Sequence, residues 1–262
     1  IVKIGKNVTQ DSIGVPVECG SNLITSIIPC GECGPCVSTP GRTNLCENMG
    51  CYGLMGEQAD NKFNGWFSDY MVLKKGSTFF NVSGFTLEER ILIEPVAVAV
   101  HAVERAKTTN LLNFASPVLI QGCGPIGLSI IAVLKTMGVQ NIIAVDGQAS
   151  RLELAKELGA KTGLNFKKYE STEALIEAVQ ALTNSRGAQF AFQCTGVPAA
   201  ASTVWKLIAR GGGLCELGFF VNNGKASINP HFDICNKEIT LVGSWAYSPE
   251  DYPNAIECMK SI

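Results

Sequence analysis

Long apolar runs are missing from this sequence of 262 residues. No stretch approaches the ~18 uninterrupted apolar residues of a membrane-spanning helix, and the first residues hold no apolar signal core. The 21 lysines and arginines, set against 23 acidic residues, form no cluster that would bind nucleic acid or a membrane surface. We therefore expect a cytoplasmic globular protein whose partners are small molecules rather than nucleic acids or membranes.

Catalytic signatures are equally scarce. The chain has two histidines, His101 and His231, and it contains no HExxH, GxSxG or P-loop motif. Metalloprotease, serine-hydrolase and NTPase chemistry therefore have no support in the sequence. A partly buried, hydrogen-bonded core residue is the commoner role for such a histidine. We predict this role for both.

Cysteine, by contrast, is abundant. Of eleven cysteines, Cys30, Cys33 and Cys36 are spaced by two residues, and Cys46 follows after nine more. Such clustering in a reducing compartment indicates a metal rather than disulfides. Four thiolates on one loop can close a tetrahedral zinc site with no open position, which makes the site structural. Cys51 is the alternative fourth ligand, and a set of buried or redox-active cysteines is the alternative to a metal.

A glycine-rich turn organises the rest of the chain. It contains Gly122, Gly124 and Gly127, follows an apolar run at 118–120 and opens an amphipathic segment at 126–137. This order of strand, turn and helix is typical of a dinucleotide-binding βαβ unit, in which the glycines allow the turn, the approach of the pyrophosphate and close packing. The pyrophosphate would lie at the helix N-terminus, where free N–H groups favour negative charge. A purely structural turn is the alternative.

The next apolar run ends in an acidic residue. Residues 142–145 are apolar and Asp146 follows, where a dinucleotide-binding unit presents a carboxylate to the ribose. A carboxylate there repels a 2′-phosphate, so the sequence favours NAD over NADP. Arg151 could stack on the adenine or neutralise a phosphate.

Strands and helices alternate after this turn. We predict six strands in a doubly wound parallel α/β sheet, with a helix from Pro198 that glycines 211–213 end. Ligands bind at the carboxyl ends of such strands. We predict short β segments instead for residues 1–29 and 51–95. The first of these ranges begins with the strand-like sequence IVKIG.

The segment EPVAVAVHAVERA, residues 94–106, predicts a helix with Glu94 near its start. Glu94 is either a first-turn charge stabilised by the helix dipole or a metal ligand or proton acceptor at a domain junction.

Five motifs together resemble one family. The cysteine loop, EPVAVAVHAVERA, GCGPIG with Asp146, QCTGVP and RGGG follow in the order of the zinc-dependent medium-chain alcohol dehydrogenases, most closely the sorbitol, threonine and butanediol dehydrogenase branch. The resemblance implies a partial GroES-like catalytic domain at 1–98, a Rossmann domain at 99–247 and a return to the catalytic domain at 248–262. It also implies a homo-oligomer, a dimer or tetramer, for which the edge strand EITLVGSW is a candidate surface.

The resemblance further implies NAD and zinc as cofactors and oxidation of a polyol or other secondary alcohol to the ketone. Zinc would polarise the hydroxyl while hydride passes to the nicotinamide. By motif match, Glu94 falls on the carboxylate at or next to the catalytic zinc, and the four clustered cysteines fall on the structural zinc. The positions matching cofactor contacts are Gly122, Gly124, Pro125, Ile126, Gly127, Asp146, Arg151, Cys194, Thr195, Gly196, Leu217, Gly218, Phe219, Ser244, Trp245 and Ala246.

Departures from the family pattern set further expectations. The G-x-C-G-x-D and G-H-E motifs of the catalytic zinc are not in the chain, so we expect an incomplete enzyme whose 262-residue form is inactive. Ala246 stands where sorbitol dehydrogenases carry a substrate-binding arginine, which argues against sorbitol itself. The alternatives are a zinc-free NAD(P)H reductase of the same fold and a non-catalytic dinucleotide-binding protein.

Overall fold

Two units divide the chain in the computed structural model, which describes residues 1–11, 14–39, 41–54 and 65–262. The first unit comprises Ile1–Glu94 and Ala246–Ile256, and the second comprises Pro95–Trp245 and Glu257–Ile262. Within the described residues, no helix is both long enough and apolar enough to cross a membrane.

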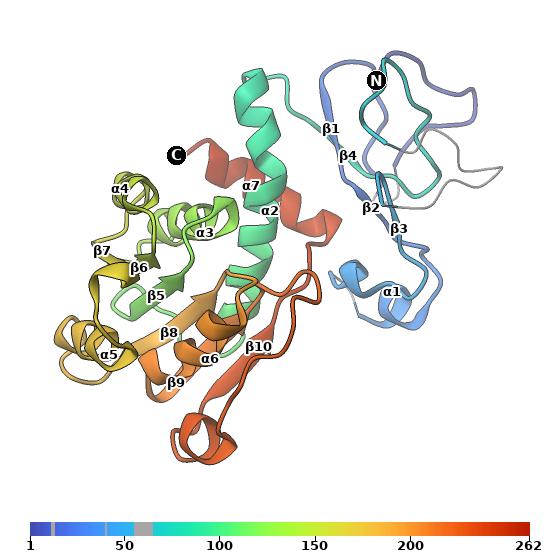
Figure 1. Cartoon of the computed structure of the whole chain (residues 1–262). Helices are drawn as coiled ribbons and strands as arrows, with labels where there is room; N and C mark the ends of the chain where they lie inside the picture. Colours follow the sequence, from blue (N-terminus) through green and yellow to red (C-terminus); the bar gives the residue numbers. More distant parts are fainter. Residues whose placement is uncertain (12–13, 40, 55–64) are drawn as a thin grey trace. The chain divides into compact units, whose positions relative to one another are not determined.

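Six parallel strands form the sheet of the second unit (Figure 1). They are β5 (Pro117–Gln121), β6 (Asn141–Asp146), β7 (Thr162–Asn165), β8 (Ala188–Gln193), β9 (Ile208–Glu216) and β10 (Thr240–Gly243). Their spatial order is β10-β9-β8-β5-β6-β7, so the direction of winding reverses between β5 and β8. This reversal is the switch point at which doubly wound sheets bind ligands. The predicted Rossmann architecture is confirmed.

Helices cover both faces of this sheet (Figure 1). They are α3 (Pro125–Thr136), α4 (Ala149–Glu157), α5 (Thr172–Ala181) and α6 (Pro198–Leu207), with the short turns η2 (Phe166–Lys168) and η3 (Pro230–Cys235) between elements. Leu119, Ala191 and Leu214 of the sheet pack with Val179 and Val204 of α5 and α6 in one fully buried core. Prolines at the first helical position start α3 and α6, where the missing N–H costs no hydrogen bond.

The prediction that α6 runs to glycines 211–213 is wrong. The helix ends at Leu207, and the glycines lie inside β9. A register shift between Ala188 and Phe190 bulges the β8–β9 pairing. A Cβ on Gly213 would lie 2.5 Å from the ring of Phe190. The glycines therefore allow β9 to pack closely on its neighbour rather than stopping a helix.

Short antiparallel pairs make up the sheet structure of the first unit. In one pair β1 (Asn22–Ile24) lies beside β4 (Phe79–Asn81), and in the other β2 (Ile27–Ile28) lies beside β3 (Gly50–Cys51). Helix α1 (Gly34–Ser38) and the turns η1 (Thr43–Leu45) and η4 (Pro249–Asp251) also belong to this unit. The segment IVKIG was predicted to be a strand, and it forms none in the structure. Its Ile1 ammonium group donates to the carbonyl oxygen of Gly20 at 2.8 Å.

Helix α2 (Leu87–Lys107) begins earlier than predicted, and α7 (Tyr252–Met259) follows η4. Thr86 and Glu89 form a reciprocal cap at the start of α2: the Thr86 N–H donates to the Glu89 carboxylate at 2.7 Å, and the Glu89 N–H donates to the Thr86 hydroxyl at 3.3 Å. Glu94 consequently lies two turns inside the helix. The interpretation of Glu94 as a first-turn charge is therefore wrong.

The two histidines differ. His101 is 4% exposed on α2, which confirms a core role. His231 in η3 is exposed and packs edge-on against Phe232, with ring centroids 4.8 Å apart, so its predicted burial is wrong.

Candidate functional site

Four cysteine sulfurs converge in the first unit. The Sγ atoms of Cys30, Cys33, Cys36 and Cys46 all lie within 4.8 Å of one another. The Cys30–Cys36 and Cys33–Cys46 pairs are 4.0 and 3.9 Å apart. A tetrahedral zinc with Zn–S bonds of about 2.3 Å places its sulfurs about 3.8 Å apart. The geometry and the donor type both fit a closed, structural zinc ion. Cys51 is outside this group, and its Sγ lies 3.8 Å from the carbonyl oxygen of Tyr52.

Backbone N–H groups surround these sulfurs. The N–H of Cys33 donates to the sulfur of Cys30 at 3.4 Å, and the N–H of Cys30 donates to that of Cys46 at 3.2 Å. Donation from the backbone of Glu32 and Cys33 lowers the pKa of Cys30 to about 6. Burial raises the pKa of Cys36 to about 12 and also raises that of Cys46. The positive charge of a bound metal favours the thiolate form of such ligands.

Glu94 lies in a second group of the first unit. It is half-buried, and burial raises the pKa of its carboxyl while a hydrogen bond from the Tyr247 hydroxyl lowers it. Burial and the charge of Glu94 raise the pKa of Cys51. A catalytic zinc takes three protein ligands, whereas the four-cysteine group is the sole cluster of three or more metal-binding side chains among the described residues. The residues around Glu94 therefore do not form a catalytic zinc site by themselves.

Sequence reasoning missed Tyr247. No motif marks it, and the contact with Glu94 joins positions 153 residues apart, the difference between 247 and 94. Burial and the charge of Glu94 raise the pKa of Tyr247 to about 12, so its phenol keeps its proton for donation at neutral pH.

The glycine-rich turn lies between β5 and α3. Gly122 has φ of +94°, and a Cβ there would overlap the Thr195 side chain. A Cβ on Gly127 would overlap the carbonyl oxygen of Gly122. A Cβ on Gly124, by contrast, would meet nothing within 4 Å, and this residue precedes the first turn of α3. Two glycines are thus required by packing, while Gly124 leaves the open approach to a helix N-terminus that a pyrophosphate needs.

Asp146 lies at the end of β6, beside this turn. Its carboxylate is 7% exposed and accepts the N–H groups of Cys123 and Gln148, each at 2.8 Å. These bonds use different oxygens, so each oxygen keeps a lone pair for a ribose hydroxyl. The Arg151 guanidinium is 3.9 Å away and half-exposed. The residues present fit the ribose of a nicotinamide dinucleotide.

Further strand ends line up with the turn. Gln121, Gln193 and Glu216 are register partners on β5, β8 and β9. Gln193 accepts the N–H of Thr195, and Glu216 accepts that of Gly218 at 2.8 Å. These two side chains, which sequence reasoning missed, brace the loops that hold Cys194, Thr195 and Gly196 and Leu217, Gly218 and Phe219. Burial raises the pKa of Glu216.

The last predicted positions are divided between the units. Ser244 and Trp245 follow β10 in the second unit, where the Trp245 ring stacks on Phe220 with centroids 5.1 Å apart. Ala246 belongs to the first unit and has φ of +49°. Its grouping with the cofactor positions therefore stays a prediction.

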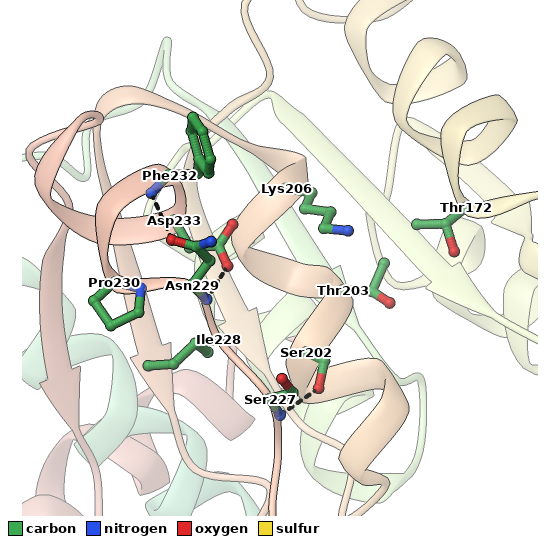
Figure 2. Close-up of a pocket in the computed structure, with 10 residues that line it drawn as sticks. All are labelled: Thr172, Ser202, Thr203, Lys206, Ser227, Ile228, Asn229, Pro230, Phe232 and Asp233. Carbon is green, nitrogen blue, oxygen red and sulfur yellow. Dashed lines mark hydrogen bonds between the residues drawn. The ribbon is translucent and has the colours of Figure 1, made fainter.

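A cavity of about 630 Å³ lies elsewhere in the second unit. Figure 2 shows Ser202 of α6 beside Ser227, with the Ser227 N–H donating to the Ser202 hydroxyl at 2.8 Å, and Lys206 of the same helix extending toward the side on which Thr172 lies. None of the predicted cofactor or metal positions lines this cavity. It is separate from the site at the strand ends.

The fold is that of a dinucleotide-binding protein, and the four converging cysteines could hold a metal ion. A family model described as zinc-binding dehydrogenase matches residues 125–261. Sorbitol dehydrogenase of Bacillus subtilis is 32% identical over 100% of this chain and 67% of its own length, and probable D-xylulose reductase A of Emericella nidulans is 31% identical with the same coverage. An alcohol dehydrogenase structure from Thermotoga maritima superposes with a TM-score of 0.87 at 26% identity, covering 97% of this chain and 69% of that one.

The chain belongs to the zinc-binding dehydrogenase family. The predicted membership of the zinc-dependent medium-chain alcohol dehydrogenases is confirmed. The chain spans about two thirds of the length of both curated relatives.

Proposed function

We propose that this chain serves NAD- and zinc-dependent oxidation of a polyol or other secondary alcohol to the ketone, within a polypeptide of the length of its relatives. The observation that carries the proposal is the open approach at Gly124 with the Asp146 carboxylate beside it, in a chain of this family. Relatives named for sorbitol and D-xylulose support a polyol as substrate.

Each part of the dinucleotide site has its own role in this proposal. The N–H groups at the start of α3 bind the pyrophosphate, and the two oxygens of Asp146 accept the ribose hydroxyls. The loops at 217–219 and 244–245 would hold the nicotinamide, which would supply the hydride acceptor for oxidation of the alcohol carbon. A catalytic zinc, held in part by ligands outside this chain, would supply the Lewis acid that lowers the pKa of the alcohol hydroxyl. Glu94 is the residue of this chain that we assign to that place, as a ligand or a neighbour.

The four cysteines hold a second, structural zinc in this proposal. None of the eleven cysteines is joined in a disulfide, which supports a reducing, cytoplasmic location. We also propose a homo-oligomer that pairs through β10, because this strand lies at the edge of the sheet and its Leu241 is 53% exposed.

The test uses the product of the whole reading frame that contains this sequence. NADH binding is followed by fluorescence, and NAD-dependent oxidation is measured with sorbitol, other polyols and simple secondary alcohols. We expect turnover with NAD, and we expect D146A to weaken NADH binding about tenfold or more, since it removes a charged acceptor. Zinc analysis should give two ions per chain.

Other results identify the alternatives. Turnover with one zinc per chain would support the zinc-free reductase. NADH binding without turnover on any alcohol or ketone would support the dinucleotide-binding protein. Size-exclusion chromatography with light scattering tests the assembly, because L241K should shift an oligomer paired at β10 toward the monomer.

A further inference from the structure

The segment between Ala246 and Tyr252 contacts two distant parts of the first unit. Ser248, which is fully buried, lies at its centre. The N–H of Asn44 donates to the Ser248 hydroxyl at 3.3 Å. The hydroxyl oxygen lies 3.1 Å from the carbonyl oxygen of Gly41 and 3.1 Å from Oδ1 of Asn44, so its single proton has two acceptors in reach. Ser248 therefore holds the loop at 41–44 by both its donor and its acceptor capacity.

That loop leads directly to a metal-binding cysteine. Asn44 is the middle residue of η1, and Cys46 follows this turn, with its N–H donating to the carbonyl oxygen of Thr43 at 3.0 Å. Asn44 is 2% exposed. A metal that fixes Cys46 relative to the other three cysteines also fixes the position of Asn44.

Tyr247, the residue before Ser248, contacts Glu94. Tyr247 is 3% exposed and donates its hydroxyl proton to Glu94. Burial and the charge of Glu94 raise the pKa of the phenol, and hydrogen bonding with Ser26 opposes them. The ring meets the ring of Tyr252 edge-on with centroids 5.2 Å apart, and Tyr252 stacks on Phe80 at 5.4 Å. The phenol is thus held in place by contacts on several sides.

We propose that Tyr247 is a positioning residue for Glu94 and that the metal-bound cysteine loop orders it through Ser248. The inference rests on the proposed function for the assignment of Glu94 to the reaction. Ser248 and Tyr247 are adjacent, so the chain cannot move one away from the loop without displacing the other from the carboxylate. The structural metal thereby acts on the orientation of a reacting-site carboxylate that it does not touch.

Hydrogen exchange tests the link without any need for activity. The informative amides are those of Ser248, which donates to the Asp251 carboxylate at 2.7 Å, and of Asp251, which donates to the carbonyl oxygen of Ser248 at 3.0 Å. Removing zinc from the cysteine loop with a chelator should lower the protection of both at least tenfold, while amides of β5 keep theirs. S248A with its zinc still bound should show the same loss at the Ser248 amide, whose bond to the Asp251 carboxylate does not use the Ser248 side chain.

E250A is the matched control in the same segment. It removes an exposed bond from the Thr43 hydroxyl at 3.3 Å and leaves Ser248 intact, so protection should not change. Because S248A is measured with the metal in place, it decides the question even if chelation unfolds the unit. Undiminished protection in zinc-loaded S248A would overturn the proposal.

Turnover tests the positioning role. Y247F should lower kcat at least tenfold while the Kd for NADH and the zinc content of the cysteine loop stay unchanged. Y70F, which alters a tyrosine that is 77% exposed in the same unit, should leave all three unchanged. A wild-type kcat in Y247F would show that Tyr247 does not position Glu94 for the reaction. If the wild-type protein oxidises no alcohol, the proposed function fails, whereas the exchange experiment still reports on the link from the cysteine loop to residues 246–251.

Discussion

The dinucleotide site of the second unit and the Glu94 region of the first unit are assembled in different ways. The glycine turn, α3 and Asp146 come from one stretch of the chain and need only the pairing of β5 with β6. Glu94 receives its hydrogen bond from a tyrosine that reaches it from the other end of the sequence. The first site is therefore formed by a local sequence motif. The second site forms only when segments that are distant in the sequence pack against each other.

The largest effect is expected from a substitution in the dinucleotide site at Gly127, where packing is tightest. G127A places a Cβ in overlap with the backbone carbonyl oxygen of Gly122, so the turn must shift. We expect a loss of about 2 kcal/mol or more in the free energy of unfolding and no measurable NADH binding. Urea denaturation and NADH fluorescence measure the two effects.

G124A is the control for that variant. Its Cβ meets open space, so the folded protein should keep nearly its full stability while losing NADH affinity through contact with the pyrophosphate. Equal loss of stability in both variants would contradict the division between packing glycines and an open approach.

The next largest effect is expected from a substitution in the cysteine loop of the first unit. C46S removes one of four converging sulfurs, and we expect the bound zinc of this loop to fall from one per chain to well below one. C51S should retain the zinc, because its sulfur is outside the group. Elemental analysis of both variants measures this difference. Zinc retained in C46S and lost in C51S would assign the fourth ligand to Cys51 instead.

Local patterns accounted for much of the fold and less of the sites. The strand, glycine turn and acidic strand end predicted the doubly wound sheet, because each signal depends on neighbours within about thirty residues. Helix α2 was mispredicted even though its cap, Thr86 with Glu89, is a local signal that could have been found. The contacts of Ser248 with Asn44 and of Tyr247 with Glu94 have no sequence signal, since they depend on tertiary packing alone.

A smaller effect separates Glu216 from Glu94, two half-buried carboxylates whose pKa is raised by burial. Burial raises the pKa of Glu216 above its ordinary 4.5. Well below pH ~4.5 the group is protonated in both states; as pH rises from the unfolded-state pKa through the higher folded-state pKa, the unfolded state gains relative stability because its carboxyl ionises more readily. Relative to E216Q, the wild type should therefore lose up to about 1 kcal/mol of unfolding free energy across that window, a figure reduced by solvent screening.

The amide of E216Q still offers an oxygen to the N–H of Gly218, so NADH binding should survive. E94Q is the matched change in the other unit, and it should lower kcat at least tenfold without weakening NADH binding. A loss of kcat in E216Q equal to that in E94Q would remove the functional distinction between the two carboxylates. Unfolding curves at several pH values and steady-state kinetics supply the comparison.

The smallest effect lies where the chain passes between the two units. Ala246 has φ of +49°, a left-handed conformation that costs a residue with a Cβ roughly 1 kcal/mol. Glycine adopts it without that cost but gains more freedom in the unfolded state. A246G should therefore raise the free energy of unfolding by less than about 1 kcal/mol. The strained residue directly precedes Tyr247, so if the strain also helps to direct the phenol toward Glu94, A246G will gain stability and lose kcat together. A gain in stability with unchanged kcat would show that the packing of Tyr247 and Ser248 is sufficient to position the carboxylate.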